Sequence, residues 1–305
     1  MKFYREAQLT ISLINTEKDG YIDTLYIKGL RISFYIMKTL SSTTNSAVIK
    51  IWNLSQDHRN LIKDFGDEVT LYAGYREEDQ GGGPSVLFIG DTTTVTHQYD
   101  LPEIVTILEC GDGEKYINQS RVNLSFSANT SARNIINGIA DQIKFGNKPI
   151  DFVEFAISPD LVYRQGFKHN GTARSALEIV CNKLNLQYSI QNNQLQIIPI
   201  NGTISEPIIQ VNQATGMQGI PQRYTYRSLD LYRSVDQRNT GYKVNVALNP
   251  FILPGSKIDL ASSHLNFRGP YRVETVRHEG DTFGLVWTSQ LECTELLQGA
   301  TEGVS

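Results

Sequence analysis

Two stretches with the same order of residues lie far apart in the chain and decide its interpretation. The first reads Val95-Thr-His97 and then Leu108-Glu-Cys110, and the second reads Val276-Arg-His278 and then Leu291-Glu-Cys293. Each stretch lies in segments where apolar and polar residues alternate, which is the pattern of a half-buried β-strand. The repeated order indicates two β regions built on one plan.

The residues before these stretches extend the match. The first copy is preceded by Ile49-x-Ile51 and by Gly66-Asp67-x-Val69-x-Leu71, and the second by Val244-x-Val246 and by Gly255-Ser256-x-Ile258-x-Leu260. The second copy has fewer residues between its glycine and its cysteine than the first, and a shorter central loop explains this difference. We therefore expect an internal duplication, and the alternative is two unrelated sheets that share strand patterns.

Other segments add strands at both ends of the chain. Alternation predicts strands at 8–14, 30–39, 48–52, 69–73, 87–89 and 104–110, and again at 242–246, 257–260, 269–276 and 285–293. Ser55 is the expected N-cap of a short helix at 56–65, with Leu61, Ile62 and Phe65 as its apolar stripe. The glycine run at 81–83 predicts a hairpin tip, because it lacks the GK[ST] of a phosphate-binding loop.

The middle of the chain changes its period. Ser131 or Thr130 caps an expected helix at 132–143, and Thr172 caps another at 173–184. Two short strands follow, at 187–190 and 194–198, with a tight turn at Asn192-Asn193. The fold class is therefore mainly β with a small α+β insert. The expected domains are a first barrel at 1–114, the insert at 115–200 and a second barrel at 201–305.

The composition excludes several classes of protein. The 305 residues include 28 basic and 32 acidic side chains, a net charge of −4, which argues against a dedicated nucleic-acid binder. No run approaches the roughly 18 apolar residues of a membrane span, and residues 1–6 lack a secretory apolar core. We expect a soluble protein made in the cytoplasm. Charged residues make up 20%, below the usual ~25%, which suggests surface hidden against neighbours.

The reactive residue types form no catalytic or metal-binding motif. Cys110, Cys181 and Cys293 are far apart, and Cys181 is expected in a helix core rather than as a nucleophile. The five histidines form no HExxH pair; they are His58, His97, His169, His264 and His278. His97 and His278 occupy matching places, which favours packing or an interface over catalysis.

One acidic pair needs separate treatment. Asp112 and Glu114 are too few oxygen ligands for a calcium loop, so a turn is expected there. We therefore predict no catalytic, cofactor-binding or metal-binding residue and no cofactor.

The chain resembles the baseplate hub proteins of contractile-tailed bacteriophages. The resemblance covers about half of the chain, in order and at both ends. It is carried by Ala47-Val-Ile-Lys-Ile-Trp-Asn-Leu-Ser55, Gly66-Asp-Glu-Val-Thr-Leu-Tyr-Ala-Gly-Tyr75, Leu87-Phe-Ile-Gly-Asp91 and Thr106-Ile-Leu-Glu-Cys-Gly-Asp-Gly-Glu114, and near the other end by Leu253-Pro-Gly-Ser256, Gly269-Pro-Tyr-Arg-Val273, Val276-Arg-His278 and Leu291-Glu-Cys293.

The resemblance implies a structural hub and not an enzyme. In such hubs three subunits, each with two barrels related to the tail tube, form a pseudo-six-fold ring between the hexameric tube and the trimeric spike. The implied partners are the tube protein or a tube-initiator ring, the spike, wedge and sheath proteins, and the tape-measure protein in the lumen. DNA would pass without specific binding along a neutral to acidic wall, because a basic wall would hold phosphates.

Two alternatives stay open at this point. One is a tail-associated peptidoglycan or glycan hydrolase, which would need two carboxylates in a cleft. The other is the hub of a tail-derived secretion or injection system. The expected location is the virion baseplate, after assembly in the bacterial host cytoplasm.

Overall fold

The fold is known from a computed structural model, which describes residues 4–14, 22–42, 45–62, 66–76, 83–113, 118–145, 148–154, 157–158, 161–204, 207–229 and 236–296. Most of these residues lie in strands, so the mainly β class is confirmed. No helix in these ranges is long and apolar enough to cross a membrane. The expected hairpin tip at 81–83 lies mostly outside the described residues.

The first β region contains seven strands and one short helix. They are β1 (Tyr4–Ile14), β2 (Ile22–Ile27), β3 (Ile32–Thr39), β4 (Asn45–Trp52), α1 (Gln56–Leu61), β5 (Glu68–Arg76), β6 (Ser85–Asp100) and β7 (Glu103–Asp112). The strands pair in the order β3-β4-β7-β6-β5-β1-β2, all antiparallel. Ser55 caps α1 by accepting a hydrogen bond from the amide of His58, as expected.

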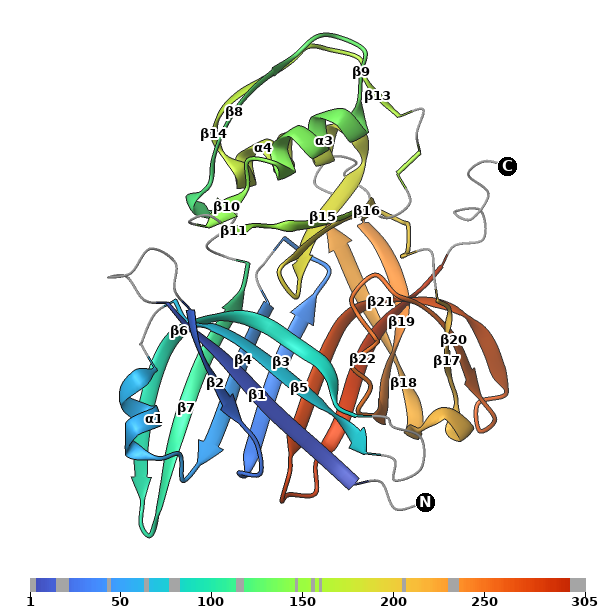
Figure 1. The fold of residues 1–305 in the computed structure, drawn as a ribbon. Helices are drawn as coiled ribbons and strands as arrows, with labels where there is room; N and C mark the ends of the chain where they lie inside the picture. Colours follow the sequence, from blue (N-terminus) through green and yellow to red (C-terminus); the bar gives the residue numbers. More distant parts are fainter. Residues whose placement is uncertain are drawn as a thin grey trace.

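The second β region joins the same sheet. It contains β17 (Ile209–Val211), the 3-10 turn η1 (Gln213–Thr215), β18 (Met217–Leu229), β19 (Asp236–Ala247), β20 (Lys257–Ser262), β21 (Phe267–Asp281) and β22 (Trp287–Glu295). Its order is β18-β19-β22-β21, with β20 and then β17 on the other side of β21. The long β21 also pairs with β3, so the described strands of both regions form one continuous path of hydrogen bonds (Figure 1).

The insert lies at one end of this sheet (Figure 1). Its described residues contain the helices α3 (Ala132–Ala140) and α4 (Ala173–Leu184) and nine short strands. The strands are β8 (Arg121–Phe126), β9 (Thr130–Ser131), β10 (Lys144–Phe145), β11 (Lys148–Pro149), β12 (Asp151–Glu154), β13 (Val162–Tyr163), β14 (Phe167–Thr172), β15 (Leu186–Gln191) and β16 (Gln194–Pro199), of which β9 is a two-residue lead into α3. Both helices are amphipathic and face a common core with the β15–β16 hairpin.

The described residues contain three clusters of buried apolar side chains. One fills the first β region, one fills the insert, and one fills the second β region. The first cluster also contains Leu248 and Trp287 from the second region. The two β regions therefore share part of a core as well as a sheet.

The strands of the two β regions pair in a matching order. In the first region the successive neighbours are β4, β7, β6 and β5, and in the second they are β19, β22, β21 and β20. The registers also agree. The residues that lie opposite one another across three strands are Ile49, Leu108 and Val95 in the first region and Val244, Leu291 and Val276 in the second.

The match extends to an irregularity in the long strand. The pairing of β6 with β7 slips between Thr92 and Thr94, and the pairing of β21 with β22 slips between Val273 and Thr275. Each bulge lies at the same distance from the matching histidine. Bulges are specific features of a sheet rather than defects, so their agreement is informative.

A pair of backbone hydrogen bonds is also repeated. A glycine with positive φ, 109° at Gly66 and 89° at Gly255, precedes β5 or β20. The backbone amide of this glycine donates to the carbonyl of one residue on the long strand. The backbone amide of that same strand residue donates to the carbonyl of the residue that follows the glycine. The bonds are Gly66 to Thr92 and Thr92 to Asp67 at 3.0 and 2.9 Å, and Gly255 to Val273 and Val273 to Ser256 at 2.8 and 3.0 Å.

Several predicted boundaries need correction. Helix α3 ends at Ala140, before the predicted 143, and Leu61 of α1 is exposed rather than part of a buried stripe. The last strand begins at Trp287, because Leu285 lies in the preceding loop and is 94% exposed. Helix α1 ends at Leu61, before the predicted 65, and the backbone of Ile62 that follows it is extended.

Candidate assembly surfaces

Large apolar side chains are exposed at the same hairpin of both β regions. Tyr99 and Leu101 lie at the β6–β7 hairpin, and Phe283 and Leu285 lie at the β21–β22 hairpin, with exposed fractions between 68% and 94%. Both hairpins are at the end of the sheet away from the insert, because β7 runs from its hairpin toward the insert (Figure 1). Grouped exposed apolar side chains mark sites of protein contact.

Side chains from the first region hold the second of these hairpins. Arg5 donates from Nη1 to the carbonyl of Gly284 at 2.7 Å and from Nη2 to that of Leu285 at 3.1 Å. Arg31 donates from Nη2 to Asp281 Oδ2 at 2.8 Å. Burial raises the pKa of the Asp281 carboxyl, but the hydrogen bonds from Arg31 and from the backbone outweigh it, and the net pKa is lowered. Asp281 is therefore held ionised as a structural acceptor.

A buried polar cluster joins the insert to the first β region. Asp112, at the end of β7, accepts hydrogen bonds from the backbone amides of Asn192 at 2.7 Å and Asn193 at 2.9 Å. Asn45 donates to the same carboxylate at 3.1 Å. Lys38 donates from Nζ to Asn192 Oδ1 at 2.7 Å. The β15–β16 turn is thus fixed to the ends of three strands of the first region.

The ionisable members of this cluster are fully buried. Burial raises the pKa of Asp112, against hydrogen bonds from Asn193, Asn45 and Asn192 and the charge of Lys38. Burial lowers the pKa of Lys38 to about 8, against the charge of Asp112. Asp112 is the last residue of β7 rather than part of the expected turn, and Glu114 lies outside the described residues. Lys38 is missing from the sequence-based prediction, although it continues the period-two face of Ile32, Phe34 and Ile36 and so marks a buried charge.

The two matching histidines differ in environment. His97 Nδ1 lies 3.2 Å from Thr106 Oγ1, and His278 Nδ1 lies 2.8 Å from Ser289 Oγ. His97 is exposed, whereas His278 is fully buried. Burial, and then the charge of Lys38, lower the pKa of His278 well below its usual value. The two histidines lie at comparable registers of β6 and β21, opposite Thr106 and Ser289, and of the two only His278 is buried.

The buried histidine predicts a loss of stability in acid. Because the pKa of His278 is lower in the folded state, the unfolded chain binds more protons below pH 6.5, and stability falls as pH falls through that range. The loss approaches about 1.4 kcal/mol per pH unit. Urea unfolding at several pH values should show a shallower acid slope for His278→Gln. His97→Gln is the control, and an equal change there would contradict the assignment.

The cysteines carry no reactive site. Cys110, Cys181 and Cys293 are all free thiols and all buried. Burial raises the pKa of Cys181 to about 12, so it is not a thiolate nucleophile. No group of three metal-ligand side chains occurs within the described part of the chain.

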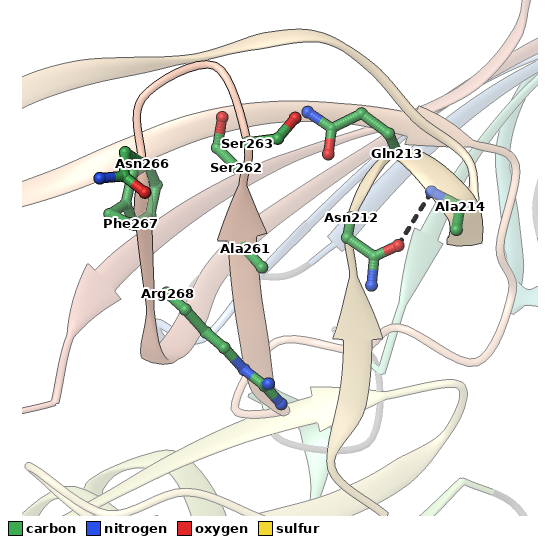
Figure 2. A pocket seen from close by; sticks show the side chains of 9 residues that line it. All are labelled: Asn212, Gln213, Ala214, Ala261, Ser262, Ser263, Asn266, Phe267 and Arg268. Carbon is green, nitrogen blue, oxygen red and sulfur yellow. Dashed lines mark hydrogen bonds between the residues drawn. The ribbon is translucent and has the colours of Figure 1, made fainter.

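An open groove of about 580 Å³ lies between η1 and the β20–β21 hairpin (Figure 2). Its lining is mainly neutral, and Asn212 accepts a hydrogen bond from the amide of Ala214 at 2.9 Å across one wall (Figure 2). Arg268 is its charged member and is paired with Asp259, with Nε to Oδ2 at 2.9 Å. The lining residues include neither two carboxylates nor a nucleophile beside a base.

Comparison with known proteins gives one sequence family. A family model described as "Baseplate hub gp41" matches residues 11–250. A search of curated proteins found no match.

Solved structures with the same fold come from phage tails and a related secretion system. The 43 kDa tail protein of prophage MuSo2 from Shewanella oneidensis has a TM-score of 0.62 at 10% identity, over 95% of this chain and 97% of that one. A tail protein from Neisseria meningitidis gives 0.59 at 10% identity, over 95% and 97%. An Escherichia coli component of the type VI secretion system gives 0.56 at 11% identity, over 86% and 73%.

Proposed function

The chain belongs to the Baseplate hub gp41 family, and on that premise we propose that three copies of it form the ring that joins the tail tube to the central spike. Family membership makes the chain a structural component of a phage baseplate. The trimeric ring, its pseudo-six-fold form and the contractile type of tail belong to the proposal.

The shared plan of the two β regions carries this proposal. Equal strand order, equal registers, a repeated bulge and a repeated glycine contact support descent from one duplicated unit. We assign these units to domains 1–114 and 201–305, and the insert to 115–200. Three chains then present six similar units, which suits a junction between a six-fold tube and a three-fold spike.

The exposed hairpin tips suit a stacking role. Both units present large apolar side chains at the end away from the insert, so a ring would offer two such tips per chain to the next layer. We assign the tube protein or a tube-initiator ring to that face and the trimeric spike to the opposite face. Wedge and sheath proteins would bind the outside, and the tape-measure protein and then DNA would pass through the lumen.

The net charge of −4 supports free passage of DNA, because fixed cations on the wall would bind phosphates. The proposed place of action is the virion, after assembly in the host cytoplasm. An injection-system hub is the second candidate, because a component of a type VI secretion system shares the fold.

A hydrolase role lacks a favourable site. A second groove, of about 300 Å³, contains Glu279 and Asp281, but Asp281 is paired with Arg31 and its pKa is lowered. A carboxylate held ionised in this way is not a general acid. We therefore propose a structural hub without catalysis.

The mass of the assembly tests the proposal. We expect native mass spectrometry of the purified chain, alone or with its spike, to give a species of three times 34.3 kDa, ring-shaped in negative stain. The same sample should release no soluble fragments from peptidoglycan. A chain that stays monomeric with its spike, or that cleaves the glycan, would be incompatible with a trimeric structural hub.

A further inference from the structure

The two matching long strands differ in what covers their outer edge. One edge of β21 pairs with β20 over residues 267–272 and with β3 over residues 275–281. The matching edge of β6 pairs with β5 up to Asp91. Beyond that point, over the stretch 94–100 that matches 275–281, no described strand pairs with it. β3 fills this position beside β21, whereas no described strand fills the matching position beside β6.

The strand that matches β3 lies at the other end of the sheet. Ile32 of β3 lies opposite Ile51, and Met217 of β18 lies opposite the matching Val246. After a bulge in β18, Gln222 lies opposite Lys243, and in the first unit Tyr35 lies opposite the matching Val48. Gln222 therefore matches Tyr35. Whereas β3 pairs with strands on both of its edges, β18 pairs among the described strands with β19 alone.

Burial follows the same difference. On the covered side, His278 of β21 and Ile36 of β3 are 0% exposed. The matching positions, His97 of β6 and Arg223 of β18, are both exposed. An exposed strand edge is a template for pairing with another chain. The first unit thus has an uncovered edge on β6, and the second unit has β18, the strand that matches the one covering the same edge of β21.

We propose that β18 of one copy pairs antiparallel with the outer edge of β6 in the next copy. The internal β3–β21 contact sets the register, in which Thr39, Met37 and Tyr35 lie opposite Thr275, Arg277 and Glu279. Transferred by the strand matches, Gln222 lies opposite Gln98, Tyr224 opposite Thr96, and Arg223 opposite His97. This inference rests on the proposed ring and names the surfaces that close it.

The contact is head-to-tail. Each chain uses β6 toward one neighbour and β18 toward the other, so the interface is heterologous, as a cyclic assembly requires. The contact inside the chain and the contact between chains would then be two versions of one interface. That relation gives a ring with twice as many similar units as chains.

Cysteine cross-linking tests the register. Gln98 and Gln222 are exposed, and all three native cysteines are buried, so new thiols at these positions would react selectively. Antiparallel partners have Cα atoms about 4.5–5.5 Å apart, within the range that a disulfide spans. We expect a mixture of Gln98→Cys and Gln222→Cys chains to form a disulfide-linked dimer under mild oxidation. The double variant, which carries both cysteines, should form linked species of two and then three chains and no larger ones.

Control samples should cross-link weakly or not at all. Gln98→Cys with Arg223→Cys is shifted by one residue, which turns the thiol to the other face, so its cross-linking should be at least tenfold weaker. After denaturation without a reducing agent, each single variant alone should have the mass of one chain. Efficient cross-linking of Gln222→Cys with itself, or equal yields for both mixtures, would overturn the inference.

The two proposals fail separately. If the unmodified chain has the ring mass but the Gln98–Gln222 mixture gives no dimer, the edge pairing is wrong and the ring stands. If the mixture cross-links in register but the assembly mass is not that of a trimer, the edge pairing stands and the proposed hub is wrong. No cross-link and no assembly would overturn both.

Discussion

Replacing Asp112 by alanine is expected to lower the free energy of unfolding by about 3–5 kcal/mol, the usual cost of removing one member of a buried charged cluster. The carboxylate accepts from two backbone amides of the insert and from Asn45, and Asp112 is fully buried. The variant also leaves the Lys38 ammonium without its opposing charge. Urea unfolding followed by circular dichroism measures the loss.

Two further variants separate this cause from a general loss of packing. Replacing Lys38 by methionine in the Asp112→Ala chain should recover part of the stability, because it removes the unpaired buried charge. Glu292→Gln breaks the partly exposed pair with Lys243 and should cost no more than about 1 kcal/mol. If Asp112→Ala costs as little as Glu292→Gln, the cluster does not fix the insert.

The sequence predicts what depends on local pattern. The helix at 173–184, its Thr172 cap and the Ser131 cap of α3 all follow from side chains within a few positions, and all three are confirmed. The turn at Asn192-Asn193 is confirmed in the same way, since both residues have positive φ, which asparagine tolerates better than most residues.

Pairing between strands that are far apart in the chain cannot be predicted from local sequence pattern. The contact of β3 with β21 joins residues more than 230 positions apart, and no local pattern in either strand specifies the other. The sequence pattern does not predict β18, because Gly219 and Pro221, which lie in its bulge, interrupt the alternation. The buried polar cluster cannot be predicted from local pattern, because its members come from four separate segments of the chain.

The shared core makes a second prediction with a large effect. Trp287 opens β22 of the second region, yet its ring packs edge-on against Phe34 of the first, with ring centroids 5.3 Å apart. Gly280 leaves the space for it, since a Cβ there would lie 2.7 Å from the Trp287 ring. Trp287 therefore packs at the place where β21 pairs with β3.

Trp287→Ala is expected to cost about 3–5 kcal/mol, as for other buried large side chains. Because the ring belongs to the first core, hydrogen exchange should become faster in β3 and β4 as well as in β22. The aromatic Phe283, four residues earlier and 74% exposed, provides the matched control, and Phe283→Ala should change stability by no more than about 0.5 kcal/mol. If Trp287→Ala leaves exchange in β3 and β4 unchanged, the Trp287 ring does not couple the cores of the two regions.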